Sequence, residues 1–159
     1  MELVKIDRNN VWEITKLKVT DEQENFVAPN AYSIIEAYAT ISSGCTALPF
    51  GLYHDGKPVG FVMIGYGTIG DEDEPCIADG NYCIWRFMID RNYQGKGLGK
   101  KGMEAVLDYI MTFPCKEADY CWLSYEPENK AAASLYHHFG FEETGEMDGD
   151  EIIAVKKLF

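Results

Sequence analysis

The sequence predicts an α/β fold with a mixed central β-sheet of about six to seven strands and helices on both faces. Strand-like and helical patterns alternate along the 159 residues in the order βααβββαβαβ(β), the last strand closing a hairpin. The pair Asp55-Gly56 separates two apolar runs, as a tight turn does. A later apolar run leads through a glycine-rich turn straight into an amphipathic helix. Because the chain has no internal repeat and is long enough for one core, we expect a single domain over residues 1–159.

The first third of the chain is expected to supply one strand and two helices. Residues 3–6 form the strand, and Asn9 or Asn10 caps a helix. The apolar face of this helix is predicted to carry Trp12, Ile14 and Leu17. A polar, acidic segment at 21–24 comes next. The second helix is predicted from apolar residues at Ile34, Ile35, Tyr38 and Ile41.

The rest of the chain is expected to complete the sheet. Residues 50–54 and 59–67 form the hairpin, and the charged run at 71–75 is interpreted as a solvated loop without a function of its own. A central strand then ends near Ile89, before the glycine-rich turn and its helix. The remaining pattern predicts a strand at 120–125, a helix at 130–139 and a final hairpin from 142 to 155.

The glycine-rich turn predicts a ligand that carries a phosphate group. In Gln94-Gly95-Lys96-Gly97-Leu98-Gly99, glycines at alternate positions leave backbone N–H groups uncovered. These N–H groups lie where a helix begins and its dipole presents positive partial charge. An anionic phosphate can therefore settle there.

Spacing separates three kinds of phosphate loop. A Walker A loop would need a glycine at Gln94 and a hydroxyl residue at Lys101, so it fails twice. The dinucleotide pattern is matched by Gly97, Gly99 and Gly102, but the strand ends too early and too little chain follows for that fold. The pattern Gln/Arg-x-x-Gly-x-Gly/Ala is filled in the right place, after a strand and at the mouth of a helix.

In this pattern the chain resembles the GNAT superfamily of N-acetyltransferases. A second element supports the resemblance downstream, where the predicted strand at 120–125 leads through the turn 126–129 into a helix. Asn129 and Tyr136 fall at the positions of the family's asparagine and tyrosine, and Phe139-Gly140-Phe141 follows the last helix as in the family. Two motifs at the proper separation are far more specific than one glycine loop.

The resemblance implies acetyl-CoA as the co-substrate and no metal. Its pantetheine arm would pair with the strand at Phe87, Met88 and Ile89, with the N–H of Ile89 meeting the oxyanion, and Asn129 would bond the arm. Tyr136 would act as the general acid towards the leaving thiolate. The pyrophosphate would be wrapped by Gln94, Gly95, Lys96, Gly97, Leu98, Gly99 and Lys100.

Charge and a longer pattern point to the acceptor. The chain has 26 acidic and 14 basic residues, which makes nucleic acid an unlikely partner and favours a small cationic amine. The stretches 26–30, 85–90 and 123–129 look like those of bacterial spermine/spermidine (diamine) N-acetyltransferases. That resemblance implies a polyamine substrate, with contacts from Glu24, Phe26, Trp85 and Glu126.

Two alternatives stay open at the level of function. The chain could acetylate another amine (an amino acid, an aminoglycoside or a protein amine), or bind acyl-CoA as a sensor without catalysis. The identity of the general base is also open. The resemblance to polyamine acetyltransferases implies a carboxylate on the central strand, but this chain has Trp85 and Arg86 at those positions. Glu126, Asp79 and the segment 21–24 are candidates, as is a relay through water.

Other features of the sequence bear on location and assembly. Five cysteines form an odd set without a C-x-x-C pair, so we expect reduced, mostly buried thiols and no metal or redox cofactor. There is no apolar run long enough to span a membrane and no signal-peptide pattern at the start, so we expect a cytoplasmic protein. A homodimer is possible, with the final hairpin as a candidate interface.

Overall fold

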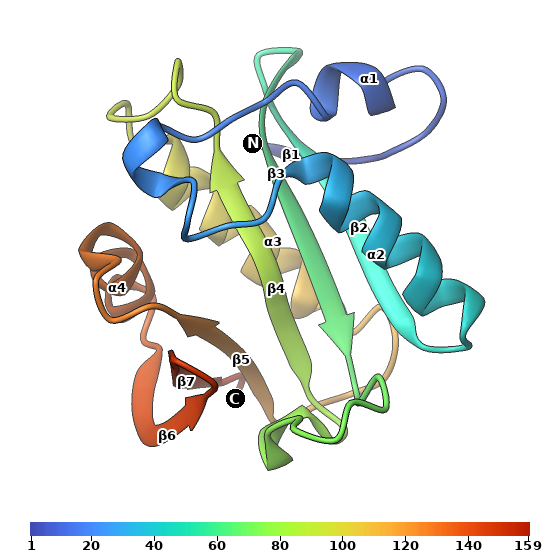
Figure 1. The fold of residues 1–159 in the computed structure, drawn as a ribbon, viewed down its shortest axis with the longest axis vertical. Helices are drawn as coiled ribbons and strands as arrows, with labels where there is room; N and C mark the ends of the chain where they lie inside the picture. Colours follow the sequence, from blue (N-terminus) through green and yellow to red (C-terminus); the bar gives the residue numbers. More distant parts are fainter.

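A computed structural model describes residues 1–159, with one seven-stranded sheet in the order β1-β2-β3-β4-β5-β7-β6 (Figure 1). The strands are β1 (Glu2–Lys5), β2 (Thr46–His54), β3 (Lys57–Tyr66), β4 (Tyr82–Ile89), β5 (Tyr120–Tyr125), β6 (Glu142–Asp148) and β7 (Glu151–Lys157). The helices are α1 (Val11–Ile14), α2 (Asn30–Ser42), α3 (Leu98–Ile110) and α4 (Lys130–His138), and two short 3₁₀ helices are η1 (Asp21–Gln23) and η2 (Cys76–Ala78). The predicted order of elements is confirmed, and the closing hairpin supplies the last two strands.

The sheet is mixed because only one pair of its strands runs parallel. All neighbours are antiparallel except β4 and β5, which α3 connects by a crossover. The predicted hairpin joins β2 to β3 through His54 paired with Lys57. At Gly60, a side chain would place its Cβ only 2.3 Å from the carbonyl oxygen of Met88, so the close approach of β3 and β4 requires a glycine.

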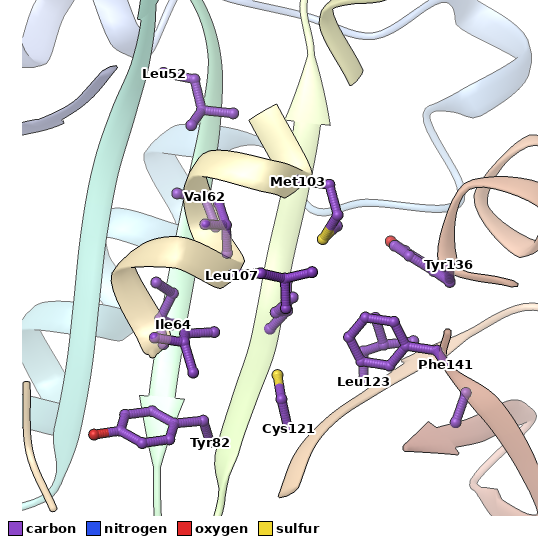
Figure 2. Packing of buried hydrophobic residues seen from close by; sticks show 14 of the residues in the cluster. Leu52, Val62, Ile64, Tyr82, Met103, Leu107, Cys121, Leu123, Tyr136 and Phe141 are labelled. Carbon is purple, nitrogen blue, oxygen red and sulfur yellow. The ribbon is translucent and has the colours of Figure 1, made fainter. Parts of the chain in front are cut away.

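Helices cover both faces of the sheet, as the sequence predicts. On one face, strand residues such as Val62 and Ile64 pack with Met103 and Leu107 of α3 (Figure 2). On the other face, Phe61 and Met63 alternate with these residues and pack under α1 and α2. Because β3 is buried on both sides, it reads in the sequence as a continuous apolar run.

The first helix differs from the prediction. α1 is a single turn in which Ile14 is fully buried, whereas Trp12 is 73% exposed and Leu17 lies beyond the helix. Asn10 occupies the N-cap position, but its amide donates to the carbonyl oxygen of Lys5 and its Oδ1 accepts from the N–H of Asp7. Ile14 is the only buried residue of this helix.

The second helix turns a different side to the sheet than its apolar residues suggest. Asn30, Ser33 and Ala37 are buried, and Ile34 is half-buried. The other apolar residues from which the helix is predicted, Ile35, Tyr38 and Ile41, are all exposed. Small and polar residues let α2 approach the sheet closely, and the Asn30 amide donates to the carbonyl oxygen of Ile14 at 2.9 Å.

The cysteines are all free thiols. Only Cys121 is buried, Cys76 is exposed, and the other three are half-buried, so the expectation of mostly buried thiols is wrong. Burial raises the pKa of Cys83 and Cys121 well above that of a free thiol, which keeps both protonated. No helix of the structure combines the length and the apolar character needed to cross a membrane.

Candidate active site

A cavity opens where β4 and β5 separate. The two strands pair only at their first residues, Tyr82 with Cys121 and Cys83 with Trp122, and then diverge (Figure 1). The cavity between them has a volume of about 900 Å³. Its walls come from both strands, from α4, from the segment 23–29 and from the loop that precedes β4. A cavity of this size can hold an extended ligand.

A β-bulge in β4 shapes one wall of the cavity. Met63 of β3 pairs with Arg86, whereas Ile64 pairs with Ile84, so Trp85 is an additional residue in β4. Two consecutive side chains therefore lie on the α2 side of the sheet. Trp85 packs against the core under α2, and Arg86 donates from Nη2 to Glu36 Oε2 of α2 at 3.0 Å.

The backbone at the end of β4 presents donors to the cavity. The N–H of Asp90 donates to the carbonyl oxygen of Val59, the residue that precedes Gly60 in β3. Because N–H groups alternate in direction along a strand, the N–H groups of Ile89 and Phe87 point the other way, into the gap that β5 leaves. The carbonyl oxygen of Ile89 also points there and accepts from Gln94 Nε2 at 2.9 Å.

The glycine-rich turn joins this strand to α3. Gly97 is the N-cap of α3 with φ +75°, a conformation that favours glycine, and no side chain caps the helix. The first N–H groups of a helix have no partner within it, so those of α3 are available to an anion. Gly99 has an ordinary helical backbone, and a Cβ there would meet nothing within 4 Å.

Side chains tie the turn to the segment between α1 and α2. Gln94 Nε2 donates to Gln23 Oε1 at 2.8 Å as well as to Ile89. The buried carboxylate of Asp90 accepts from the N–H of Lys18 at 2.9 Å. Gln23 and Gln94 both line the cavity. The expected phosphate loop and the expected acceptor wall are therefore directly hydrogen-bonded to each other.

Most of the site residues predicted from sequence meet at this one cavity. Twelve line it, namely Glu24, Phe26, Trp85, Phe87, Met88, Ile89, Gln94, Gly95, Gly99, Glu126, Asn129 and Tyr136. Four do not, namely Lys96, Gly97, Leu98 and Lys100. The side chain of Leu98 is buried in the core, and Lys96 Nζ donates to the carbonyl oxygen of Asn92 on the outside of the turn.

Tyr136 on α4 reaches the cavity from the β5 side. Its ring packs against Tyr125 and Phe141, with centroids 5.5 and 6.0 Å away. Burial, followed by the charge of Glu151, raises the pKa of Tyr136 well above its usual value, so its hydroxyl keeps the proton. Asn129 begins α4, and its Oδ1 accepts from the N–H of Ala132 at 3.2 Å.

The end of the cavity away from the glycine turn is acidic, and the sequence did not reveal this. The run at 71–75 is more than a solvated loop, because Asp71, Asp73 and Glu74 line the cavity. Asp148 and Glu151, from the final hairpin, also line it. Burial, then the charges of Asp73 and Glu74, raise the pKa of Asp148 above its usual value. About 75 residues separate the two groups, so no local pattern connects them.

Three of the candidate bases lie elsewhere. Asp79, Asp21 and Glu22 do not line the cavity, and Asp21 forms only a long, exposed ion pair with Arg91 at 3.9 Å. Glu24 and Glu126 do line it. Glu36 is a further cavity carboxylate that the sequence did not indicate, and it is paired with Arg86.

Comparison with known proteins identifies the family. The model of the acetyltransferase (GNAT) family matches residues 11–141. A probable spermine N(1)-acetyltransferase from Bacillus subtilis subsp. natto is 41% identical over 112 residues, which cover 69% of this chain and 70% of that protein. A spermine/spermidine N(1)-acetyltransferase from Bacillus subtilis strain 168 has the same identity and coverage.

Solved structures have the same fold. An aminoglycoside acetyltransferase in complex with coenzyme A superposes with a TM-score of 0.77 at 19% identity, over 98% of this chain and 93% of that one. The ribosomal-protein-S18-alanine N-acetyltransferase of Escherichia coli gives a TM-score of 0.62 at 20% identity, over 99% and 93% of the two chains. The divergence of β4 and β5 and the glycine turn at the start of α3 agree with these matches. The chain therefore belongs to the acetyltransferase (GNAT) family.

Proposed function

We propose that this protein transfers the acetyl group of acetyl-CoA to a primary amine of a small polyamine such as spermine or spermidine. The observation that carries the proposal is the asymmetry of the cavity. One end has backbone donors beside a helix N-terminus, and the other is lined with carboxylates. The names of the relatives that are 41% identical agree with this assignment. A cytoplasmic location is part of the proposal, since the reaction consumes a CoA thioester.

In the proposed complex, acetyl-CoA occupies the end of the cavity next to the glycine turn. The N–H groups at the start of α3 bind the pyrophosphate, and the pantetheine arm lies along the edge of β4 that β5 leaves unpaired. The N–H of Ile89 or Phe87 then meets the thioester oxygen. Lys96 and Lys100, whose side chains stay outside the cavity, contribute charge near the nucleotide phosphates.

The acidic end would hold the polyamine. Eight carboxylates line the cavity, namely Glu24, Glu36, Asp71, Asp73, Glu74, Glu126, Asp148 and Glu151. Arg86 is the only basic residue among the lining residues, and Glu36 neutralises it at 3.0 Å. A negatively charged cavity concentrates a polycation and repels an anionic acceptor.

The proposed chemistry is direct transfer. The ammonium first loses a proton, to water or to a cavity carboxylate such as Glu24 or Glu126, because only the neutral amine is a nucleophile. The amine nitrogen then bonds to the thioester carbon, and the C–S bond breaks. Tyr136 gives its proton to the sulfur, and the second proton of the nitrogen returns, directly or through water, to the tyrosinate. Because its pKa is raised, the Tyr136 hydroxyl still carries its proton at the pH where amines are partly neutral.

The test is acetyl-CoA-dependent thiol release on a panel of amines. Saturable turnover is expected with spermine, spermidine and putrescine. The matched control is n-butylamine, which has the same carbon chain as putrescine but a single ammonium, so its KM should be about tenfold higher or more if the carboxylates bind the distal charge. Turnover of an aminoglycoside or lysine but no polyamine would refute the substrate class. Coenzyme A binding without turnover on any amine would refute catalysis and favour a sensor.

A further inference from the structure

The outer face of α2 is an exposed apolar surface that the catalytic proposal does not use. Eight large hydrophobic residues of the chain are exposed, and five belong to α1 and α2. These five, here called the α2 patch, are Trp12, Tyr32, Ile35, Tyr38 and Ile41, with exposures between 53% and 74%. The two helices are held together by the hydrogen bond from Asn30 to Ile14. None of the five residues lines the cavity.

The face is also uncharged, which is unusual for a helix at a protein surface. The exposed residues of α2 are Ala31, Tyr32, Ile35, Tyr38, Ala39, Ile41 and Ser42. The only charged residue of the helix, Glu36, turns towards the cavity and pairs with Arg86. An ordinary surface helix carries charged residues opposite its buried face. α2 instead has the composition of a helix that is covered on both sides, although no element of the chain lies over its outer side (Figure 1).

We propose that the α2 patch is the interface of a two-fold symmetric homodimer. In such a dimer the same surface meets itself, and an uncharged surface brings no like charges together near the two-fold axis. The chain carries a net charge of −12, which makes two copies repel each other over most of their surface. The uncharged patch is where they can approach. The same net charge opposes contact with an anionic bilayer or a nucleic acid.

The size and composition of the patch fit this partner. At the observed exposures the five side chains offer about 650 Å², taking about 150–250 Å² for one fully exposed aromatic side chain. A stable interface buries about 800 Å² on each partner, and the polar atoms at the rim of the patch supply the difference. Tryptophan and tyrosine are enriched at interfaces and among the residues that contribute most of the binding energy. Because none of the five residues lines the cavity, the proposed interface contains no part of the cavity wall.

The experiment is to measure molar mass by light scattering or sedimentation. The intact protein is expected at about 36 kDa, twice the 18.0 kDa of one chain. Concentrations up to about 100 μM suffice, because an interface of this size has a Kd in the micromolar range or below. The variants Ile35→Glu and Tyr38→Glu should each run as 18.0 kDa monomers with unchanged circular dichroism, since both side chains are exposed in the single chain.

The control variant is Met147→Glu, on the final hairpin that the sequence also offers as an interface. Met147 is 53% exposed, so the substitution introduces the same charge at a comparable surface position. It should remain a dimer. A monomeric wild type at the highest concentration overturns the proposal, and so does a dimer that Met147→Glu dissociates and Ile35→Glu does not. Thiol release by the monomeric Ile35→Glu variant separates a failure of this inference from a failure of the catalytic proposal.

Discussion

The end of the cavity next to α3 is built mainly from backbone, whereas the opposite end is built from side chains. At the α3 end, the edge of β4 and the turn at Gly97 expose N–H groups, and the nearby side chain of Gln94 is occupied by two hydrogen bonds within the protein. At the opposite end, carboxylates such as Asp73, in the loop before β4, and Asp148, at the end of β6, converge from distant parts of the chain. A binding site made of backbone depends little on side chains, so it can bind the same acetyl donor throughout a family. A site made of side chains can change the amine acceptor without changing the fold.

The largest effect is expected at Tyr136, which lines the cavity from α4. Tyr136→Phe removes the proposed proton donor but keeps the ring between Tyr125 and Phe141. We expect kcat to fall about 100-fold or more, as for the loss of a general acid, with the Kd for coenzyme A unchanged. Steady-state thiol release and calorimetry measure the two quantities.

The control for this variant is Tyr125→Phe. Tyr125 also lines the cavity, but its hydroxyl donates to Glu143 Oε1 at 2.7 Å and so has no proton to offer the sulfur. This variant should keep most of its kcat. Equal kcat values for Tyr136→Phe and wild type would rule out the general-acid role and leave the thiolate to be protonated by water.

A smaller effect is expected at the backbone end, where two neighbouring glycines should behave oppositely. Gly97→Ala forces an L-residue to keep φ +75°, which costs about 1–2 kcal/mol, or the turn changes shape. We expect the turn to relax in the free protein, so that coenzyme A has to restore the strained conformation, and the Kd for coenzyme A should rise about tenfold, since 1.4 kcal/mol is a factor of ten. Calorimetric titration with coenzyme A measures the change.

Gly99→Ala is the matched variant two residues further on. Its backbone is helical and its Cβ would meet nothing, so alanine should raise the unfolding free energy by up to about 1 kcal/mol and leave coenzyme A binding intact. This contrast agrees with the pattern Gln/Arg-x-x-Gly-x-Gly/Ala, which requires glycine at the position of Gly97 and accepts alanine at the position of Gly99. Loss of affinity in Gly99→Ala together with full affinity in Gly97→Ala would contradict the assigned roles of the turn.

The same contrast explains how much the sequence could predict. The α3 end comes from one contiguous stretch, 82–110, so a local pattern captures the strand, the turn and the helix together. The acidic end is assembled from the 71–75 loop and the final hairpin, and only the folded sheet brings these together. Even within β4 the alternation fails, because the bulge at Trp85 places Arg86 on the α2 side.

The helices show the limit of apolar periodicity. In α3 the apolar residues mark the buried face, as Met103, Val106 and Ile110 show. In α2 most of them do not, because Ser33 and Ala37 pack against the sheet while Ile35 and Tyr38 face outwards. Periodicity reports which side of a helix is covered, but it does not say whether the cover comes from the same chain. An apolar face covered by a second copy gives the same signal.

The smallest effect is expected at the acidic end, where the charges are shared among many carboxylates. Asp148→Asn removes one of them, and we expect KM for spermidine to rise only about two- to fivefold, as for an interaction of 0.2–1 kcal/mol between partly solvated charges. Asp150→Asn, two residues away in the hairpin turn and outside the cavity, makes the same change in net charge. It should leave KM unchanged, so equal shifts in both variants would mean that only the overall charge of the protein attracts the amine.

The pKa of Asp148 gives a second test of the same comparison. Its pKa in the folded protein is raised above the usual 3.8, so the fold disfavours the ionised carboxylate. Above about pH 4 this lowers stability, because the unfolded chain ionises without that cost, and below that pH both states are protonated. Asp148→Asn should therefore raise the melting temperature of the ligand-free protein at pH 7 but not at pH 3.5. The same substitution should weaken the binding of spermidine. If the loss of one charge stabilises the folded protein and also weakens substrate binding, the carboxylates are held together for the substrate and not for the stability of the fold.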